Sequence, residues 1–371
     1  MIKLLTIGIH SHGMLYCRSL IIYLEINADI YLLSLPTAQA RLGTIQAFLI
    51  LMAMAMWGPR ALLHESMLLQ NQLTLLVRER DYCLRSSVVH SGKWEDWICS
   101  EGDCRTRCIA YCWLNFHSIA YDTPPLMLTL EMKIDLPQSA EMWRAASAAE
   151  WQAIQEKSSP TSVSFQSALS TLFATPINDN QQPISSLGNY VLIHALIQQI
   201  YFARQASRMA GLLTGTSNLR QEEIEIFERA LKTWQVGWER TPESSLDPTN
   251  PFGPVAFSST ALLRLAYIRL RCDIGPHRGL ETREPQVIAR ALETAPLVVR
   301  GPHVSRAVIH AAHALSIPVK LGINFVAHTQ TLIWSMQHSL VNLECAYLLS
   351  KFLVFESIAS TNSVKVNGFK P

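Results

Sequence analysis

The feature that most constrains the fold of this chain is the helical period of its apolar residues. Residues 221–240 show it best, because apolar side chains recur there every three or four positions and charged side chains lie between them. The apolar positions are Ile224, Phe227, Leu231, Trp234 and Trp238, and the charged ones are Glu222, Glu223, Glu225, Glu228, Arg229 and Lys232. This spacing predicts a helix that buries one face and turns the face with Glu222–Glu228 to solvent.

The same period recurs along most of the chain, between short stretches rich in Pro, Gly, Ser and Asn. It predicts further helices over Thr44–Met56, Pro59–Arg80, Asp103–Ala120, Ser139–Lys157, Ser164–Ala174, Asn189–Arg208, Ser258–Arg271, Glu284–Val299, Ser305–Leu315, Val319–Trp334 and His338–Ile358. No segment alternates convincingly as a strand does, and Met127–Leu136 is the one extended candidate. The prediction is an all-α fold, an irregular multi-helix bundle of about ten to fourteen helices.

Two polar segments predict connections rather than helices. Tyr82–Gly102 is expected to be a polar connection that Trp94 and Trp97 anchor to the core. Thr241–Pro254, rich in Pro, Ser and Asp, is expected to be either a domain seam or a surface loop.

The two ends of the chain differ in pattern from its centre. Residues 1–40 lack a clear period, and residues 359–371 have the composition of a loose tail. We therefore expect one domain over residues 41–358, preceded by an irregular segment and followed by a tail.

The composition indicates a large buried interior and no strong electrostatic steering. Hydrophobic residues make up 49% of the 371 residues, and charged residues make up 16%. The net charge of +2 comes without the basic cluster that a DNA-reading module would bring. The eight cysteines lack the spacing of a disulfide scaffold, which favours a reducing compartment. The apolar run within Thr44–Trp57 has about a dozen residues, fewer than the roughly 20 that span a bilayer, so no membrane segment is expected.

One cluster of cysteines invites a zinc interpretation, and its spacing argues against it. Cys99, Cys104, Cys108, Cys112 and His117 lie within about twenty residues. On a helix, cysteines four apart are about 6 Å apart along the axis, too far for sulfurs that must converge at about 2.3 Å on one ion. No Cys-x-x-Cys pair occurs in the chain. We therefore interpret these thiols as small buried apolar groups, and expect no metal in this chain.

The C-terminal third holds a second set of titratable residues, His303, His310, His313, His328 and His338. Helical metal sites usually add carboxylates on facing helices, and Glu344 is the only acid in Val304–Leu353. Core or interface histidines are the preferred interpretation. The chain also lacks the Gly-x-Ser-x-Gly motif of hydrolases and the glycine-rich loops that bind nucleotides, so it is not expected to be an enzyme.

A candidate ligand pocket is suggested by polar residues among large apolar ones. These residues are Asn189, His194, Asn324, His328 and Trp334. Aromatic residues at helical spacing more often form a simple core, so the pocket is a hypothesis about the helices Asn189–Phe202 and Leu315–Trp334.

Several long sequence words carry a resemblance to a known family. They are Trp57–Ser66 (WGPRALLHES), Phe116–Pro125 (FHSIAYDTPP), Leu187–Gln199, Ser259–Leu270, Leu315–Phe325 (LSIPVKLGINF) and Gln337–Lys351. Together they resemble the fungal-specific transcription factor domain, also called the middle homology or xylanolytic-activator regulatory region. The resemblance covers about residues 41–358 and is strongest to the branch linked to C2H2 zinc fingers.

This resemblance implies an all-helical regulatory domain in a nuclear regulator of RNA polymerase II genes, without catalytic residues. Its implied partners are the transcription machinery or other regulators, and a homodimer is a further candidate. Zinc and DNA binding are expected only in a finger module, and neither finger spacing nor a six-cysteine cluster occurs in this chain. The irregular residues 1–40 would then reflect a truncated product or a misjudged gene start.

Two other classes compete with this interpretation. One is an all-helical enzyme that depends on a metal or a ligand. The other is a stand-alone protein that dimerises with full-length regulators and modulates them.

Overall fold

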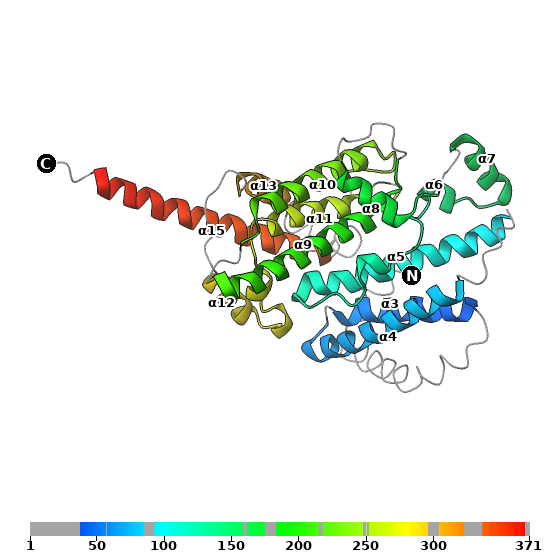
Figure 1. Cartoon of the computed structure of the whole chain (residues 1–371), viewed down its shortest axis with the longest axis horizontal. Coiled ribbons are helices and arrows are strands. Elements are labelled where there is room, and N and C mark those ends of the chain that lie inside the picture. Colours follow the sequence, from blue (N-terminus) through cyan, green and yellow to red (C-terminus); the bar gives the residue numbers. More distant parts are fainter. Residues whose placement is uncertain are drawn as a thin grey trace. The chain divides into compact units, whose positions relative to one another are not determined.

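The computed structural model confirms the all-α prediction. It describes residues 38–56, 58–84, 93–158, 162–174, 183–214, 218–247, 250, 252–295, 304–322 and 336–367. Within these residues the chain forms twelve α-helices and no strand, and an isolated bridge joins Asp135 to Ser164. Figure 1 follows these helices along the chain.

The chain divides into two compact units. The first comprises Met1–Gln166 with Leu280–Glu284, and the second comprises Ser167–Gly279 with Pro285–Pro371. Thr241–Pro254 falls inside the second unit, and its described residues lie outside the helices. The predicted single domain over residues 41–358 stays a prediction, and residues 1–37 lie outside the described part.

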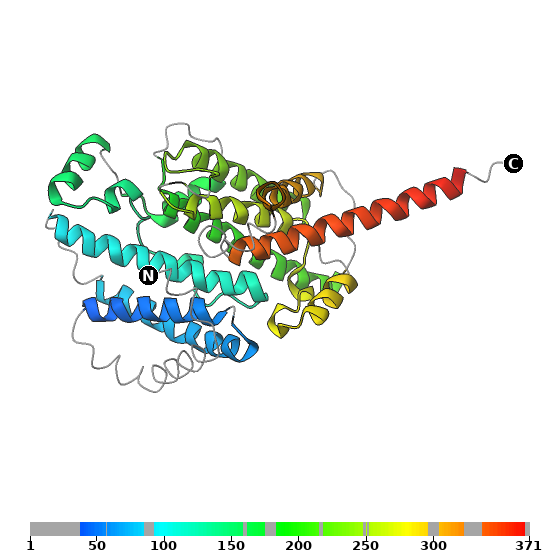
Figure 2. The ribbon, with the colours of Figure 1, turned by 180° about the vertical axis from the view of Figure 1, so that it is seen from behind.

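Three long helices form the body of the first unit, namely α3 (Ala38–Met56), α4 (Arg60–Leu84) and α5 (Trp94–Tyr121). They pack against one another, as the blue and cyan ribbons of Figures 1 and 2 show. The end of α5 is set by Asp122, which adopts the left-handed conformation with φ of 56° and donates its N–H to the Ser118 carbonyl. The sequence predicted this end within one residue, at Ala120.

The start of α5 differs from the prediction. The segment predicted as a polar connection, Tyr82–Gly102, is helical from Trp94 onward. Trp94 and Trp97 do anchor it, because they pack against the buried cluster Met142, Ala145, Trp151 and Ile154. The sequence pattern did not predict this helix, because most residues of the stretch are polar. Its burial comes from aromatic side chains, and residues far along the chain cover them.

The predicted helix Ser139–Lys157 is two helices, α6 (Ala140–Trp143) and α7 (Ala148–Ser158). Two serines account for the break, because each caps the helix that follows it. Ser139 Oγ accepts the Met142 N–H at 3.2 Å, and Ser147 Oγ accepts the Glu150 N–H at 3.3 Å.

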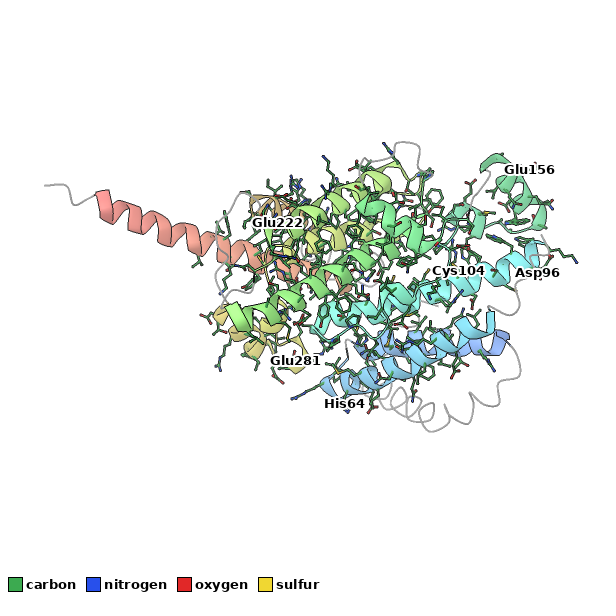
Figure 3. All side chains as sticks on the ribbon, in the orientation of Figure 1. His64, Asp96, Cys104, Glu156, Glu222 and Glu281 are labelled. Carbon is green, nitrogen blue, oxygen red and sulfur yellow. The ribbon has the colours of Figure 1, made fainter. Side chains whose placement is uncertain are left out.

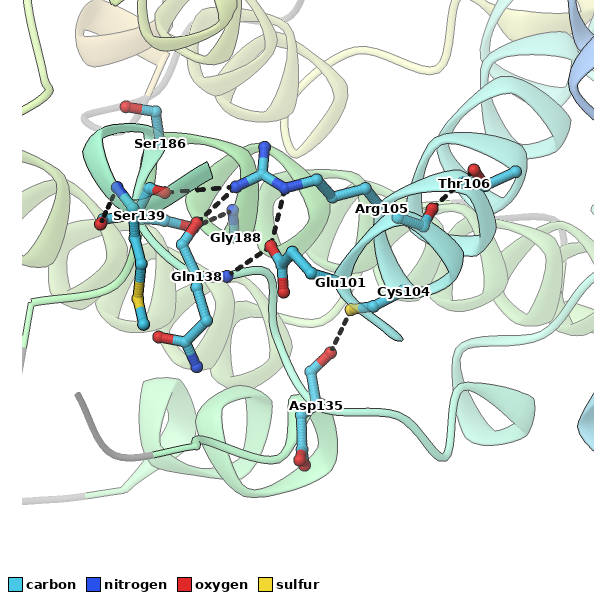
Figure 4. Close-up of polar contacts among 12 residues, drawn as sticks. Glu101, Cys104, Arg105, Thr106, Asp135, Gln138, Ser139, Ser186 and Gly188 are labelled. Carbon is cyan, nitrogen blue, oxygen red and sulfur yellow. Dashed lines mark hydrogen bonds and ion pairs between the residues drawn. The ribbon is translucent and has the colours of Figure 1, made fainter. Parts of the chain in front are cut away.

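The segment between α5 and α6 is held by a polar cluster on α5, which Figure 4 shows. Glu101 Oε1 accepts hydrogen bonds from Arg105 Nε at 2.7 Å and from the Gln138 N–H at 3.0 Å. Arg105 Nη2 donates to the Gln138 carbonyl at 2.6 Å, and its guanidinium lies 4.8 Å from the centre of the Trp143 ring. Within the predicted extended segment Met127–Leu136, residues Thr129–Glu131 instead form a 3-10 turn.

The second unit is built around α9 (Ser186–Thr214) and α11 (Val255–Arg269), which pack against each other. Every residue from Val191 to Gln198 is buried, as predicted for a helix that is apolar nearly all round. The other helices are α8 (Phe165–Phe173), which begins at the unit boundary, α10 (Gln221–Arg240), α12 (Pro285–Thr294), α13 (Val304–Leu321) and α15 (Met336–Asn367). Figure 2 shows α13 and α15 beside α11.

Three helix ends in the second unit differ from the prediction. α11 begins at Val255, so Ser258 and Ser259 do not cap it, and Ser259 Oγ donates to the Val255 carbonyl instead. α13 continues through Pro318, where a break was predicted, although an interior proline costs about 3 kcal/mol. α15 continues to Asn367, past the predicted end at Ile358.

Replacing Trp97 by alanine should loosen α6 and α7. The Trp97 ring centre lies 6.5 Å from that of Trp143 and 5.6 Å from that of Trp151, so the substitution removes the shared contact. We expect a loss of about 3 kcal/mol in local stability, measured as faster amide hydrogen exchange in α6 and α7. Leu130→Ala is the control, because this side chain is 73% exposed and its loss should leave the exchange unchanged. Equal exchange in wild type and Trp97→Ala would contradict this packing role.

Candidate functional site

The most deeply buried charge of the second unit is the Glu344 carboxylate on α15, which is 1% exposed. Arg269 of α11 binds both of its oxygens, with Nη2 at 2.6 Å from Oε1 and Nε at 3.2 Å from Oε2. Arg278, which follows α11, donates from Nη1 to Oε1 at 2.7 Å. Burial raises the pKa of Glu344, but the two guanidinium groups outweigh it and hold the pKa below its usual value.

A second acidic centre lies on α10, at Glu228. Arg271 Nη2 lies 2.5 Å from Oε1, and Arg306 Nη1 of α13 lies 3.1 Å from Oε2. The prediction that Glu228 faces solvent is therefore wrong. Its position explains the error, because it lies one turn from both Ile224 and Leu231 and so falls within their apolar stripe. Glu222, in contrast, is exposed, as Figure 3 shows on the ribbon of α10.

These ion pairs join helices that are distant in sequence. Glu344 links α11 to α15, and Glu228 links α10 to α13 and to the end of α11. Asp273 adds a third link, because it binds the Arg208 guanidinium of α9 through both oxygens. Each buried carboxylate orients arginines whose planar donors fit it, so the network fixes the register of the helices.

The histidines of the C-terminal third pack as ring systems. His310 stacks on Tyr267 with centres 4.3 Å apart and planes at 9°, and His338 stacks on Phe257 at 4.7 Å and 19°. Burial, together with the Arg264 and His313 charges, lowers the pKa of His310 to about 4. His303 and His328 lie outside the described residues. Across the described part of the chain, no three His, Cys, Asp or Glu side chains are placed to hold a metal ion.

The cysteines on α5 point to different partners. Cys104 Sγ, labelled in Figures 3 and 4, donates to the Asp135 carbonyl at 3.2 Å. Cys108 and Cys112 are buried, and burial raises the pKa of the Cys112 thiol well above its usual value. A hydrogen bond with Cys104 and burial raise the pKa of Cys108 in the same direction. Such thiols are poor nucleophiles, because the thiolate is disfavoured.

His117 lies at the far end of α5 from Cys99, and it belongs to a buried polar trio with two residues of α4. Gln70 Nε2 lies 2.8 Å from Nδ1, and Ser66 Oγ lies 3.1 Å from Nε2. With the Gln70 amide donating, Nδ1 accepts, so Nε2 carries the ring proton and donates to Ser66. The imidazole then has no lone pair for the Ser66 proton, and the pair lacks the arrangement of an activated nucleophile. The trio therefore joins α4 to α5.

The structure describes two of the five residues of the predicted ligand pocket. Asn189 Nδ2 donates to the Ile184 carbonyl at 3.1 Å and to Thr241 Oγ1 at 3.0 Å, and its carbonyl accepts Trp234 Nε1 at 2.9 Å. His194 is fully buried, and its ring centre lies 4.7 Å from that of Tyr190. Asn324, His328 and Trp334 lie outside the described residues. The pocket stays a prediction, and Asn189 serves the helix packing.

Large apolar side chains are exposed on the C-terminal helices. They are Val287, Ile309, Val319, Met336, Leu353 and Val354, each at least 44% exposed. The sequence did not single them out as surface residues, because each occupies a helix that is apolar elsewhere. They are distributed over α12, α13 and α15. None of the described helices is both long enough and apolar enough to traverse a bilayer.

Comparison with known families finds one similarity, in the C-terminal part of the chain. Residues 273–364 match the family described as the fungal transcription factor C-terminal domain. No curated protein and no solved structure matches the chain. The matched residues contain α12, α13 and nearly all of α15, together with Glu344 and Arg278.

The match over residues 273–364 confirms the resemblance to the fungal-specific transcription factor domain for that part of the chain. It includes two of the sequence words, Leu315–Phe325 and Gln337–Lys351. The resemblance of residues 41–272 rests on the remaining words. A role in transcription regulation follows for the chain, in a family that is generally not enzymatic.

Replacing Glu344 by glutamine should destabilise the second unit strongly. Arg269 and Arg278 would remain buried without the carboxylate, and removing one partner of a buried ion pair costs about 3–5 kcal/mol. The measurement is urea unfolding followed by circular dichroism. Glu222→Gln is the matched control on the exposed face of α10, and it should change stability by less than about 0.5 kcal/mol. Equal midpoints for the two variants would show that the Glu344 network does not support the fold.

Two buried histidines should make the protein sensitive to mild acid. Burial lowers the pKa of His117, with a contribution from Arg283, and that of His194 from 6.5 to about 3. Below pH 6.5 the unfolded chain binds protons that the folded chain does not, so stability falls as the pH falls from about 6.5 towards 3. Each histidine contributes a slope of up to about 1.4 kcal/mol per pH unit in this window.

Urea unfolding at several pH values measures this slope, and His117→Gln should reduce it by the share of one histidine. The control is His64→Gln, because His64 is exposed on α4 (Figure 3) and should leave the slope unchanged. An unchanged slope in His117→Gln would contradict a neutral buried imidazole.

Proposed function

We propose that this chain is the regulatory part of a nuclear transcription factor and acts through contacts with other proteins. The observation that carries the proposal is the family match over residues 273–364. The same residues expose large apolar side chains on helices that buried ion pairs hold in register. A rigid helical scaffold with exposed apolar side chains suits recognition of a protein partner.

DNA binding, in this proposal, comes from a zinc-finger module that the 371 residues do not contain. The sequence has no paired Cys-x(2–4)-Cys and His-x(3–5)-His spacing, and its net charge is +2. Zinc would belong to that module. The partners would be the transcription machinery or other regulators, which bind the helices of the second unit.

A tethering experiment tests this function. The whole chain, fused to an unrelated DNA-binding domain in yeast nuclei, should change expression of a reporter gene relative to that DNA-binding domain alone. The expected change comes from recruitment of partner proteins to the reporter gene, because the fused DNA-binding domain supplies the DNA contact that the chain lacks. Glu344→Gln is the matched variant, and it should abolish the effect because it destabilises the second unit. A stably expressed fusion without any effect would contradict the proposed function.

A mobility-shift experiment tests the missing module separately. The purified chain should give no sequence-specific shift of DNA fragments at physiological salt, because its net charge is only +2 and its sequence contains no finger spacing. A specific shift that survives competitor DNA would contradict the claim that DNA recognition lies elsewhere.

A further inference from the structure

The outer face of α13 has two distinct flanks. Ile309, Ala312 and Val319 lie on one flank, spaced three and seven residues apart, and Ile309 and Val319 are 55% and 65% exposed. Arg306, His313 and Lys320 lie on the other flank, because positions seven apart complete two turns of a helix. All three of these side chains are exposed. The face is therefore an apolar strip beside a strip of cationic and hydrogen-bond-donating groups.

The charge of this face is not balanced by its own part of the chain. α13 contains no acidic residue, and residues 296–353 contain one, Glu344. That carboxylate is buried and bound to Arg269 and Arg278, so it does not reach the surface. Arg306 does contact Glu228 at 3.1 Å, but Glu228 also binds Arg271, and the Arg306 side chain stays 56% exposed. Positive charge therefore persists along the cationic strip.

We propose that the outer face of α13 is a docking surface for an acidic amphipathic helix of a partner protein. The apolar ridge of such a helix would cover Ile309, Ala312 and Val319, and its carboxylates would pair with Arg306, His313 and Lys320. Because a like-charged helix would be repelled, the strip selects acidic partners. This inference rests on the proposed function and specifies the chemistry of its partner.

Charge complementarity favours this occupant over a second copy of the chain. The exposed face of α10 carries both signs of charge, with Glu222 and Glu225 beside Arg229 and Lys232. Such a mixed face complements a cationic strip poorly. A membrane surface is disfavoured as well, since stable attachment needs a longer basic cluster than Arg306 and Lys320 provide.

Peptide binding to the whole purified chain tests the proposal. The probe is a fluorescein-labelled peptide of 18 residues, the length of α13, with leucines at helical spacing and glutamates on one flank. Fluorescence anisotropy should give a Kd on the order of 10 μM that weakens with added salt. A peptide with the same leucines and lysines in place of the glutamates should bind at least ~10-fold more weakly.

Variants of the chain locate the binding surface. Ile309→Asp and the double variant His313→Glu/Lys320→Glu should each weaken binding at least ~10-fold, because they remove the apolar and the cationic strip respectively. Lys232→Glu on the exposed face of α10 is the charge-matched control and should not change the Kd. Circular dichroism checks that all variants keep the wild-type melting temperature.

Four outcomes would overturn the proposal. They are no binding of the acidic peptide up to about 1 mM, equal binding by wild type and both α13 variants, equal binding of the lysine peptide, and stronger binding to phosphatidylserine vesicles than to the peptide. Sedimentation adds a fifth, namely a wild-type dimer that Ile309→Asp converts to a monomer.

The reporter experiment is independent, because it measures regulation by the fusion without the peptide. If the fusion regulates the reporter and the peptide does not bind, only this inference fails. If the peptide binds and the fusion does not regulate the reporter, only the proposed function fails.

Discussion

The buried Glu344 carboxylate, bound by Arg269 and Arg278, is the interaction on which the second unit depends. A carboxylate 1% exposed would be unstable without positive partners, and two arginines from a helix and the segment after it supply them. The requirement also works in reverse, since Arg278 is 2% exposed and needs the carboxylate. The three side chains can be buried only together, so α11 and α15 must meet in one register. The network therefore specifies how the helices pack as well as stabilising them.

Ordering these helices has a consequence for the surface. The stretch from residue 296 to residue 353 contains a single acid, Glu344, which is buried, so within it the described residues of α13 and α15 expose cations and apolar groups without carboxylates. The interior charge balance therefore shapes what the exterior can bind. The proposed recognition of partners requires a firm surface, and helices held in register by buried ion pairs provide one. The stacked His310–Tyr267 and His338–Phe257 pairs add planar contacts in the same part of the unit.

Local patterns predicted the helices that carry one strong signal. The apolar stripe of α10, the all-round burial of α9 and the end of α5 near Ala120 each follow from the spacing of apolar residues, and the structure agrees with all of them. Predictions failed where a distant contact overrode the local signal. The start of α5 is stabilised by contacts of Trp94 and Trp97 with residues about fifty positions away, which no local window contains. Pro318 should interrupt α13, but the packing of that helix on α11 and α15 outweighs the cost of the proline.

By itself, the sequence determined that the chain is all-helical, that it resembles a fungal transcription factor domain, and that it lacks finger spacings. These properties follow from the short-range period of the apolar residues and from the order of the sequence words, and both can be found without coordinates. Only the tertiary structure decided which polar groups are interior and which are surface. Glu228 and Glu222 belong to one helix and to one run of charged residues. Glu228 is buried and pairs with Arg271 and Arg306, whereas Glu222 is exposed to water. The physical reason is that the burial of a charge depends on partners brought from other helices, and the linear chain does not specify those partners locally.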